Sequence, residues 1–347
     1  MKALIIFSIL LFSLGLMSHL DSSVPTFTPK EKLSDYQFFT GTLSALNPAP
    51  ALIPYELNSS LFSNYAEKLR FIVLPGGSHM NYHSTQPFDL PIGTVLIKNF
   101  YYPLDFSNPG KGRKLIETRL LVHETTGWNA LPYIWNDEQT DAFYDVAGDT
   151  RTITYLDNKG KKQTTNYVIP NKNQCKGCHT NGKEFLPIGI SARHLNKTVR
   201  FSGIQGNQLK EWANKGWLKG LPADGIPANA DWENTTASLD ARARSYLDIN
   251  CGHCHNAAGP ANTSGLFLDI HNQDPHLLGI HKTPIAAGRG SGTLSYAIVP
   301  GKPEKSILVY RMNTNDPGIA MPELGREQIH REGVALISNW IRSLQTP

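Results

Sequence analysis

The sequence has few cysteines, little net charge and a single long apolar run. Only four of its 347 residues are cysteines, and all four lie in two short motifs. The formal net charge is +4 and no run of lysine and arginine stands out, so we expect no nucleic-acid partner. No repeat period or low-complexity tract interrupts the chain. Its length suffices for two ordinary domains or one large one.

The apolar run occupies residues 3–17, directly after Met1 and Lys2. One lysine before a short apolar stretch is typical of a secretory signal peptide, which we place at residues 1–22. A permanent membrane anchor needs about 20 apolar residues, so this run is short for one. No cysteine follows it as in a lipoprotein, and no clear Ala-x-Ala cleavage site follows either. We predict export to the periplasm or the medium of a bacterium, with membrane attachment only if the segment stays uncleaved.

Each pair of cysteines belongs to the pattern Cys-x-x-Cys-His. The two motifs read Cys175-Lys-Gly-Cys178-His179 and Cys251-Gly-His-Cys254-His255. This pattern suits covalent attachment of haem, because two thiols on one turn can form thioethers with the vinyl groups while the adjoining imidazole ligates the iron. Two alternatives use the same thiols: one zinc ion held by four thiolates, or disulfides formed in an oxidising compartment.

A histidine follows both cysteine pairs, which the zinc and disulfide alternatives leave unexplained. Export also favours haem, since exported cytochromes of this type are completed outside the cytoplasm. We therefore predict two covalently bound haem c groups, with His179 and His255 as iron ligands. Attachment at the second motif alone is the nearest alternative.

The region around the second motif is predicted to be helical. Residues 238–250 carry an apolar stripe at helical spacing, and Thr235, Thr236 and Ser238 offer N-cap oxygens. Residues 327–344 carry a second stripe, so we expect two helices that pack on each other beside the haem edge. This layout predicts a cytochrome c domain over residues 236–347.

A methionine between these helices is a candidate sixth ligand. Met321 lies in a loop bounded by proline and glycine, which suits presentation of a thioether to iron better than core filling. Met312 lies in a run with helical spacing and is predicted to fill the core. A His/Met pair at haem 2 raises the reduction potential and leaves no open position, as suits electron transfer.

Residues 30–170 favour strands instead. Runs rich in β-branched and aromatic residues recur at 69–74, 94–102, 117–122, 151–155 and 166–169, separated by glycine, proline, asparagine and aspartate. We expect an antiparallel sheet whose last strand leads directly into Cys175. The predicted fold class is therefore α+β, with an N-terminal antiparallel β-rich region ending in the first haem-attachment motif. We assign residues 23–235 to the domain that carries haem 1, and the helical domain follows.

Several phrases of the sequence are similar to known proteins. Pro300-Gly-Lys-Pro-Glu-Lys-Ser306-Ile-Leu, Met321-Pro322 and Leu336-Ile-Ser-Asn-Trp340-Ile resemble the cytochrome c modules of large secreted bacterial proteins, over about residues 236–345. Others resemble a little-characterised family of secreted bacterial dihaem c-type cytochromes, including Tyr65-Ala-Glu-Lys-Leu-Arg-Phe71, Tyr133-Ile-Trp-Asn and Ala286-Ala-Gly-Arg-Gly-Ser-Gly292. The second resemblance spans nearly the whole mature chain and implies two haems and an exported redox role.

The β-rich layout before the first motif is similar to the β-sheet cytochromes, of the cytochrome c′-beta type and its lysine-crosslinked relatives. Leu90-Pro-Ile-Gly-Thr-Val-Leu-Ile-Lys98 and Gly127-Trp128 carry the likeness, which implies an open or guarded iron at haem 1. We do not extend the crosslink to Lys98, because a solvent-facing lysine explains it equally. Protein ligands remain alternatives to an open iron: His79, Met80, His83, His123 and His194.

The remaining histidines are predicted to be surface residues: His253, His271, His276, His281 and His330. The function predicted from the sequence is single-electron transfer with an unidentified redox partner protein. The alternative is a haem enzyme with an open site at haem 1, acting on peroxide, nitric oxide or hydroxylamine, with haem 2 as its electron relay. A zinc-stabilised exported binding protein is the third alternative.

Overall fold

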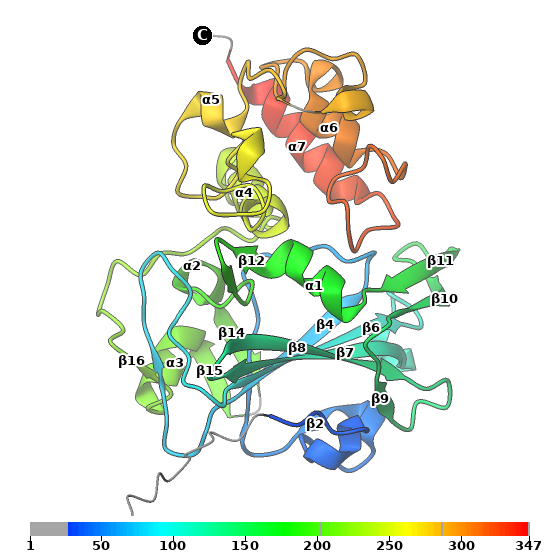
Figure 1. The fold of residues 1–347 in the computed structure, drawn as a ribbon, viewed down its shortest axis with the longest axis vertical. Helices are drawn as coiled ribbons and strands as arrows, with labels where there is room; N and C mark the ends of the chain where they lie inside the picture. Colours follow the sequence, from blue (N-terminus) through cyan, green and yellow to red (C-terminus); the bar gives the residue numbers. More distant parts are fainter. Residues whose placement is uncertain (1–26, 202, 286, 346–347) are drawn as a thin grey trace, which may run out of the picture.

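The computed structural model describes residues 27–345 except 202 and 286, so the predicted signal peptide lies outside the described residues. The fold is α+β, as predicted: an antiparallel six-stranded sheet precedes a part with several helices (Figure 1). In order across the sheet, the strands are β3 (Leu52–Pro54), β4 (Glu67–Val73), β6 (Val95–Pro103), β7 (Arg113–Glu124), β8 (Gly127–Trp135) and β9 (Ala142–Tyr144).

The predicted strands all form, since β-branched and aromatic side chains suit a pleated backbone, and β6 and β7 are buried on both faces of the sheet. The last two make a separate hairpin, β10 (Asp149–Leu156) and β11 (Lys162–Ile169). Small pairings complete the β part: β1 (Phe39–Thr40) with β2 (Asn47–Pro48), β12 (Thr180–Asn181) with β13 (Glu184–Phe185), β14 (Thr198–Phe201) with β15 (Ile204–Asn207), and parallel β5 (Met80–Asn81) with β16 (Leu218–Lys219).

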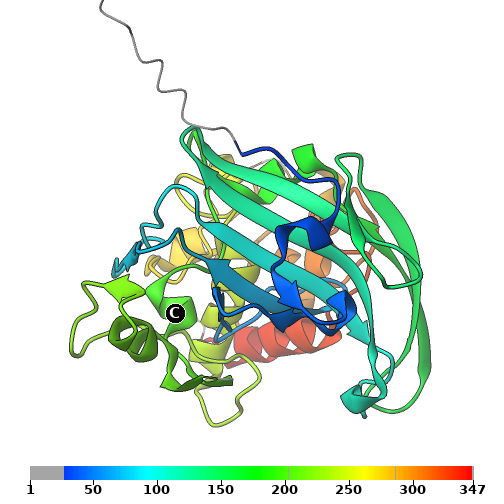
Figure 2. The same cartoon turned by 90° about the horizontal axis from the view of Figure 1, so that it is seen from below.

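The two faces of the six-stranded sheet are covered differently. The N-terminal segment, with short 3-10 turns at Leu33–Tyr36 and Leu43–Ala45, packs on one face around Ile97, Leu120 and Tyr133, as the view from below shows (Figure 2). On the opposite face lie the β10–β11 hairpin at one end and helices α2 (Ala192–Leu195) and α3 (Gln208–Asn214) at the other. Helix α1 (Lys172–His179) lies between these two apolar clusters.

The β-rich part does not end at the first motif, contrary to the sequence prediction. After α1, residues 180–219 return to the sheet and pack against its apolar end, where Trp212 and Leu218 are buried. The parallel pairing of β16 with β5 brings this return segment beside Met80. The first motif therefore lies within the β-rich part rather than at its end.

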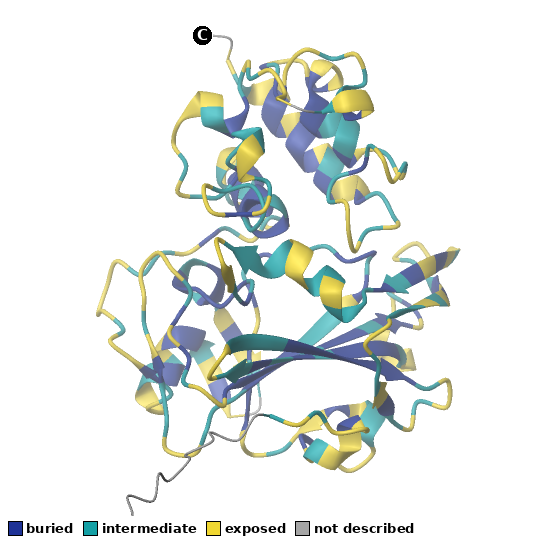
Figure 3. Ribbon diagram, viewed as in Figure 1, coloured by how far each residue is buried: buried dark blue, intermediate teal, exposed yellow. Residues whose placement is uncertain are grey.

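The C-terminal part holds α4 (Leu239–Leu247), α5 (Pro275–Leu278), α6 (Ile307–Met312) and α7 (Arg331–Ser343), with 3-10 turns at Asn262–Ser264, Gly288–Ser291 and Pro303–Lys305. The two predicted helices form: Ser238 caps α4 by accepting a hydrogen bond from Ala241, and the apolar stripe of α7 is buried (Figure 3). They pack closely because Gly333 on α7 leaves room for the Tyr246 hydroxyl, where a Cβ would clash. Trp340 Nε1 donates to Asp240 at 2.8 Å.

Polar contacts tie the helical part to the sheet part. Arg193 Nε donates to Asp248 at 2.8 Å, and His194 Nε2 lies 3.3 Å from the same carboxylate. The Phe62 ring stacks on His330 at 4.1 Å, and the Phe62 backbone N–H donates to Asn250 at 2.8 Å. Across the described ranges, no helix is long and apolar enough to cross a membrane.

Candidate cofactor sites

The first motif is carried by α1, which is separated from the end of β11 by two residues. Asn171 caps the helix by accepting from the Gln174 N–H at 2.9 Å, and the Gln174 side chain bonds back to the Asn171 N–H. Cys175 and Cys178 are three residues apart, so their thiols project from one helix face. The capped helix therefore presents both sulfurs on the same side, where one bound group can reach them.

The histidine of the first motif is oriented for metal binding. His179 Nδ1 donates to the Leu186 carbonyl at 2.7 Å. The ring also stacks on Phe185, with 4.9 Å between the ring centroids. Burial, followed by the nearby charge of Lys98, lowers the pKa of His179 to about 3. The imidazole is therefore neutral, and Nε2 is the ring nitrogen available to a metal.

The second motif repeats this arrangement at the end of α4. The helix widens into a π-helical turn, Asp248–Gly252, which carries Cys251, and Cys254 and His255 follow. Gly252 is required there because an added Cβ would lie 2.9 Å from the Asp269 Cα. His255 Nδ1 donates to the Leu266 carbonyl at 3.2 Å, and burial lowers its pKa to about 4. This ring also offers Nε2.

The second motif faces a cavity of about 680 Å³, here called cavity 2. Its walls are mainly apolar and include both cysteines of the motif, His255, Met312 and Met321. The Met321 N–H donates to the Arg311 carbonyl at 3.0 Å, and Arg311 Nε donates to Ile319 at 2.8 Å, so the methionine loop is tied to α6. Met321 is half-buried, whereas Met312 also belongs to the helical core as predicted. Both thioethers therefore border the cavity.

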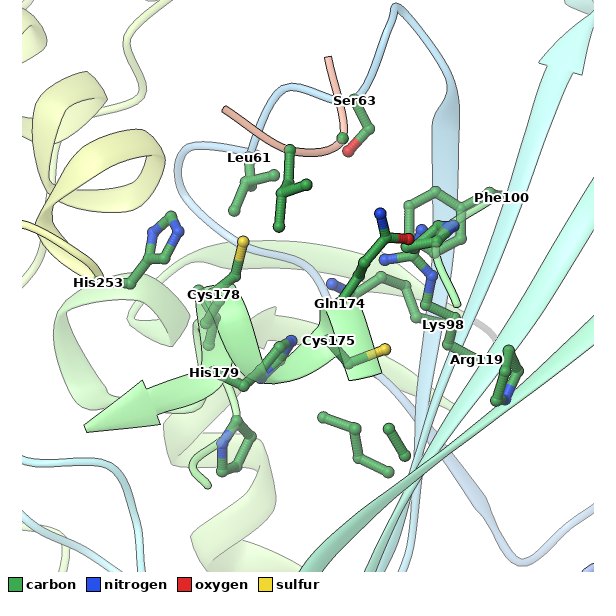
Figure 4. A pocket seen from close by; sticks show the side chains of 18 of the residues that line it. Leu61, Ser63, Lys98, Phe100, Arg119, Gln174, Cys175, Cys178, His179 and His253 are labelled. Carbon is green, nitrogen blue, oxygen red and sulfur yellow. The ribbon is translucent and has the colours of Figure 1, made fainter. Parts of the chain in front are cut away.

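The first motif faces a smaller cavity of about 120 Å³, here called cavity 1, between α1 and the sheet. Cys175, Cys178 and His179 form one wall, while Lys98, Phe100 and Arg119 stand opposite (Figure 4). Burial, then Arg70 and Arg119, lower the pKa of Lys98 to about 7. Lys98 thus borders the site and does not face open solvent.

The other ligand candidates for haem 1 lie elsewhere among the described residues. Met80 and His194 are buried in the sheet part, His123 stacks on Trp128 at 4.5 Å, and His83 accepts from backbone N–H groups of its own loop. None of these residues, nor His79, lines cavity 1.

Two of the five predicted surface histidines are misplaced by the sequence prediction. His330 is buried against Phe62 and accepts or donates a hydrogen bond at 2.9 Å with Tyr246. His253 is half-buried and lines both cavities, because the turn of the second motif is pressed against α1. His271, His276 and His281 are exposed, as predicted.

The two motifs, 76 positions apart in sequence, touch each other. The Cys178 and Cys254 sulfurs and one His253 nitrogen lie within 4.8 Å of one another. The Cys254 thiol is 3.7 Å from the Gly177 carbonyl, and the Gly182 N–H donates to Ala258 at 2.6 Å. A hydrogen bond from Cys254 lowers the pKa of the Cys178 thiol. The cavities also share lining residues: Phe62, Cys178, Asn250, His253, Pro322 and Leu324.

This geometry tests the alternatives for the thiols. All four described cysteines are free, so the disulfide alternative is not formed. Only Cys178 and Cys254 approach each other, together with His253, so the described residues do not form the four-thiolate zinc site either. Each motif presents a thiol pair and an oriented imidazole, which is the donor set that covalent haem requires. Cavity 2 has the volume of a cofactor pocket, whereas cavity 1 is smaller.

Sequence reasoning missed the contact between the motifs and the cationic wall of cavity 1. The contact joins turns far apart in the chain, which no local pattern encodes. The pairing of Lys98 with Arg119 depends on strand register, which the sequence does not give. The signal that was visible is a single cation inside each of two apolar runs, 94–102 and 117–122. Comparisons with protein-family models, with curated proteins and with solved structures find no match for this chain.

Proposed function

We propose that the protein is an exported dihaem c-type cytochrome that transfers single electrons. One observation carries the proposal: two Cys-x-x-Cys-His turns, each with its imidazole anchored through Nδ1, lie against adjoining cavities that share a wall. A hydrogen bond from Nδ1 to a backbone carbonyl holds the ring in place and leaves Nε2 free to bind a metal. The doubled pattern has no comparable explanation in a zinc site.

The chain's own residues would have distinct tasks. The four cysteines hold the two groups, and His179 and His255 ligate from anchored rings. Met321, which lines cavity 2, would supply a thioether ligand to the group held there, and residues 236–347 would act as a cytochrome c domain. Phe62, Pro322 and Leu324 exclude water from the wall between the cavities. A haem bound in these surroundings supplies one-electron exchange, with a potential set by its axial ligands and burial.

The contact between the motifs supports electron exchange within one molecule. Because the second cysteine of each motif lies beside the other, groups attached to them are held on neighbouring sulfurs. Electrons arriving from a redox partner protein at one site then reach the other without a second encounter.

The haem count tests this proposal directly. The full chain, expressed with a cytochrome c maturation system, is expected to give two haems per chain in a pyridine haemochrome assay. A chain with no haem but bound zinc would overturn it and would favour the zinc alternative at Cys178, His253 and Cys254. Reduction of both haems by one-electron donors, in titrations with two resolved steps, is the accompanying redox result.

A haem enzyme is the second candidate function. It is favoured by cavity 1, where none of the five candidate protein ligands lies near His179. An iron with an open position there could bind peroxide, nitric oxide or hydroxylamine, with haem 2 as the relay. Carbon monoxide added to the reduced protein is expected to shift the spectrum of one haem. No shift at either haem would remove the basis of this candidate.

A further inference from the structure

Three cations form a straight row across the sheet beneath α1. Arg70 on β4 pairs with Lys98 on β6, and Lys98 pairs with Arg119 on β7, so all three side chains leave the same face. Like charges directly opposite each other on neighbouring strands destabilise a sheet. Lys68 lies two residues before Arg70 on β4, opposite Phe100, and adds a fourth cation to this face.

The row is poorly compensated by negative charge. Glu117 is the buried carboxylate beside it, and both of its oxygens are engaged by Arg119, at 2.7 and 2.6 Å. The Tyr167 hydroxyl also donates to Glu117 at 2.6 Å. Glu67 is exposed, and Glu56 is paired with Lys197 at 2.8 Å. One buried carboxylate therefore faces three cations.

Two of the cations lack an acidic partner. Lys98 makes no ion pair with any described residue, and its Nζ lies 5.6 Å from the Phe100 ring centre. Arg70 is 7% exposed, and its Nε has no hydrogen-bond partner among the described residues. A buried charge without a partner is costly to a fold. The arrangement is therefore incomplete without an anion.

Cavity 1 is where that anion can lie. Lys98 and Arg119 line it opposite Cys178 and His179, and no carboxylate of the described chain lines it. Gln174 adds an amide that can donate a hydrogen bond. The remaining walls are mainly apolar, so the field of the two cations is weakly screened there.

We propose that Lys98 and Arg119, with Arg70 beside Lys98 in the same cationic row, make cavity 1 a binding site for a carboxylate or a similarly small, planar oxyanion. The anion has two sources: a free oxyanion that enters the cavity, or a carboxylate of the haem attached at Cys175 and Cys178. The row itself is independent of the proposed function, because its geometry belongs to the chain alone.

The test compares four full-length, haem-loaded proteins. They are the wild type, Lys98→Met, the charge-conserving Lys98→Arg, and Lys210→Met as a control at an exposed lysine of α3. Formate and nitrite are titrated at about pH 6, below the lowered pKa of Lys98, and the Soret spectrum gives the dissociation constant. Potentiometry on the same samples gives the potential of haem 1.

If the anion is a free oxyanion, its binding is saturable and Lys98→Met raises the dissociation constant about tenfold or more. The dissociation constants of Lys98→Arg and Lys210→Met then stay close to that of the wild type. A haem carboxylate predicts no saturable binding but a lower haem 1 potential in Lys98→Met alone, because a removed cation favours the ferric form. If Lys98→Met has the same anion affinity and the same haem 1 potential as the wild type, the proposal is overturned.

A haem-free arm separates this proposal from the proposed function. If the chain carries no haem, formate is expected to raise the melting temperature of the wild type and Lys210→Met proteins more than that of Lys98→Met. Equal responses of all three proteins would then overturn the anion site, whatever the haem count shows.

Discussion

The two cavities present the same five-residue pattern to opposite surroundings. Cavity 2 is large and mainly apolar, and it is bordered by two methionines of the helical part. Cavity 1 is small, and it sets the cations Lys98 and Arg119 of a sheet against the motif. An identical attachment turn therefore does not fix the chemistry of a site. The wall across from the histidine does, because axial ligands, polarity and access tune a haem.

The comparison also teaches where reactivity would lie. A methionine thioether beside the second motif would favour simple electron exchange if a haem were held in cavity 2. A cationic wall without an identified ligand favours binding of anions or small molecules at haem 1. We therefore expect one site that only exchanges electrons and one that also binds small molecules within the same chain.

Removal of one motif at a time has the largest expected effect on this contrast. The double variants Cys175→Ser/Cys178→Ser and Cys251→Ser/Cys254→Ser should each retain one haem, since each motif has its own thiols and its own anchored histidine. Haemochrome analysis checks the count. Carbon monoxide should shift the spectrum only in the variant that keeps the first motif. Equal reactivity in both variants would erase the contrast between the cavities.

The next effect concerns the junction of the two parts. Asp248→Asn leaves the half-buried Arg193 and the buried His194 without their carboxylate, which lies 2.8 and 3.3 Å away. Breaking a buried ion pair in this way costs about 3–5 kcal/mol. Urea unfolding followed by circular dichroism measures the loss. The exposed Glu304→Gln should change stability by less than about 0.5 kcal/mol; a similar result for Asp248→Asn would mean that this junction does not stabilise the fold.

The two methionines of cavity 2 give a smaller and more specific contrast. Met321→Ala should remove the far-red absorption band of sulfur-ligated ferric haem, because Met321 is the proposed axial ligand. Met312→Ala should keep the band and instead lower the free energy of unfolding by about 2–5 kcal/mol, since Met312 fills the helical core. Absorption spectra and urea titrations on both variants check this. Loss of the band in Met312→Ala alone would reverse the assignment.

Much of the fold was predictable because local patterns control it. The strands at 69–74, 94–102 and 117–122 form where runs of β-branched and aromatic residues predict them, and α4 begins directly after the predicted cap, Ser238. The return of residues 180–219 to the sheet was not predictable in this way. It depends on pairing between β5 and β16, which are far apart in the chain and only two residues long.

The candidate site was predictable only in its parts. The cysteines and histidines stand out by spacing, whereas the contact of Cys178 with Cys254 depends on how two separate regions pack. His330 was assigned to the surface because a lone histidine has no partner spacing, yet Phe62 and Tyr246 bury it from distant segments. Tertiary packing decides such residues.

The smallest expected effect is a pH dependence located in the sheet part rather than at either cavity. Burial, only partly opposed by Asp248, lowers the pKa of His194 from 6.5 to about 4. The folded state therefore binds this proton less readily than the unfolded state, so the stabilisation is complete above about pH 6.5 and is lost as the pH falls towards 4. Between pH 7 and pH 5 the loss amounts to about 2 kcal/mol.

Urea unfolding at both pH values measures this loss. In His194→Gln the loss of unfolding free energy between pH 7 and pH 5 should be smaller by about 2 kcal/mol. His271→Gln, at an exposed position, should behave as the wild type. Asp248 has a lowered pKa, so its own contribution declines only below its unfolded value of 3.8 and does not overlap this window. Equal pH dependence in all three proteins would show that His194 is not the source of the acid sensitivity.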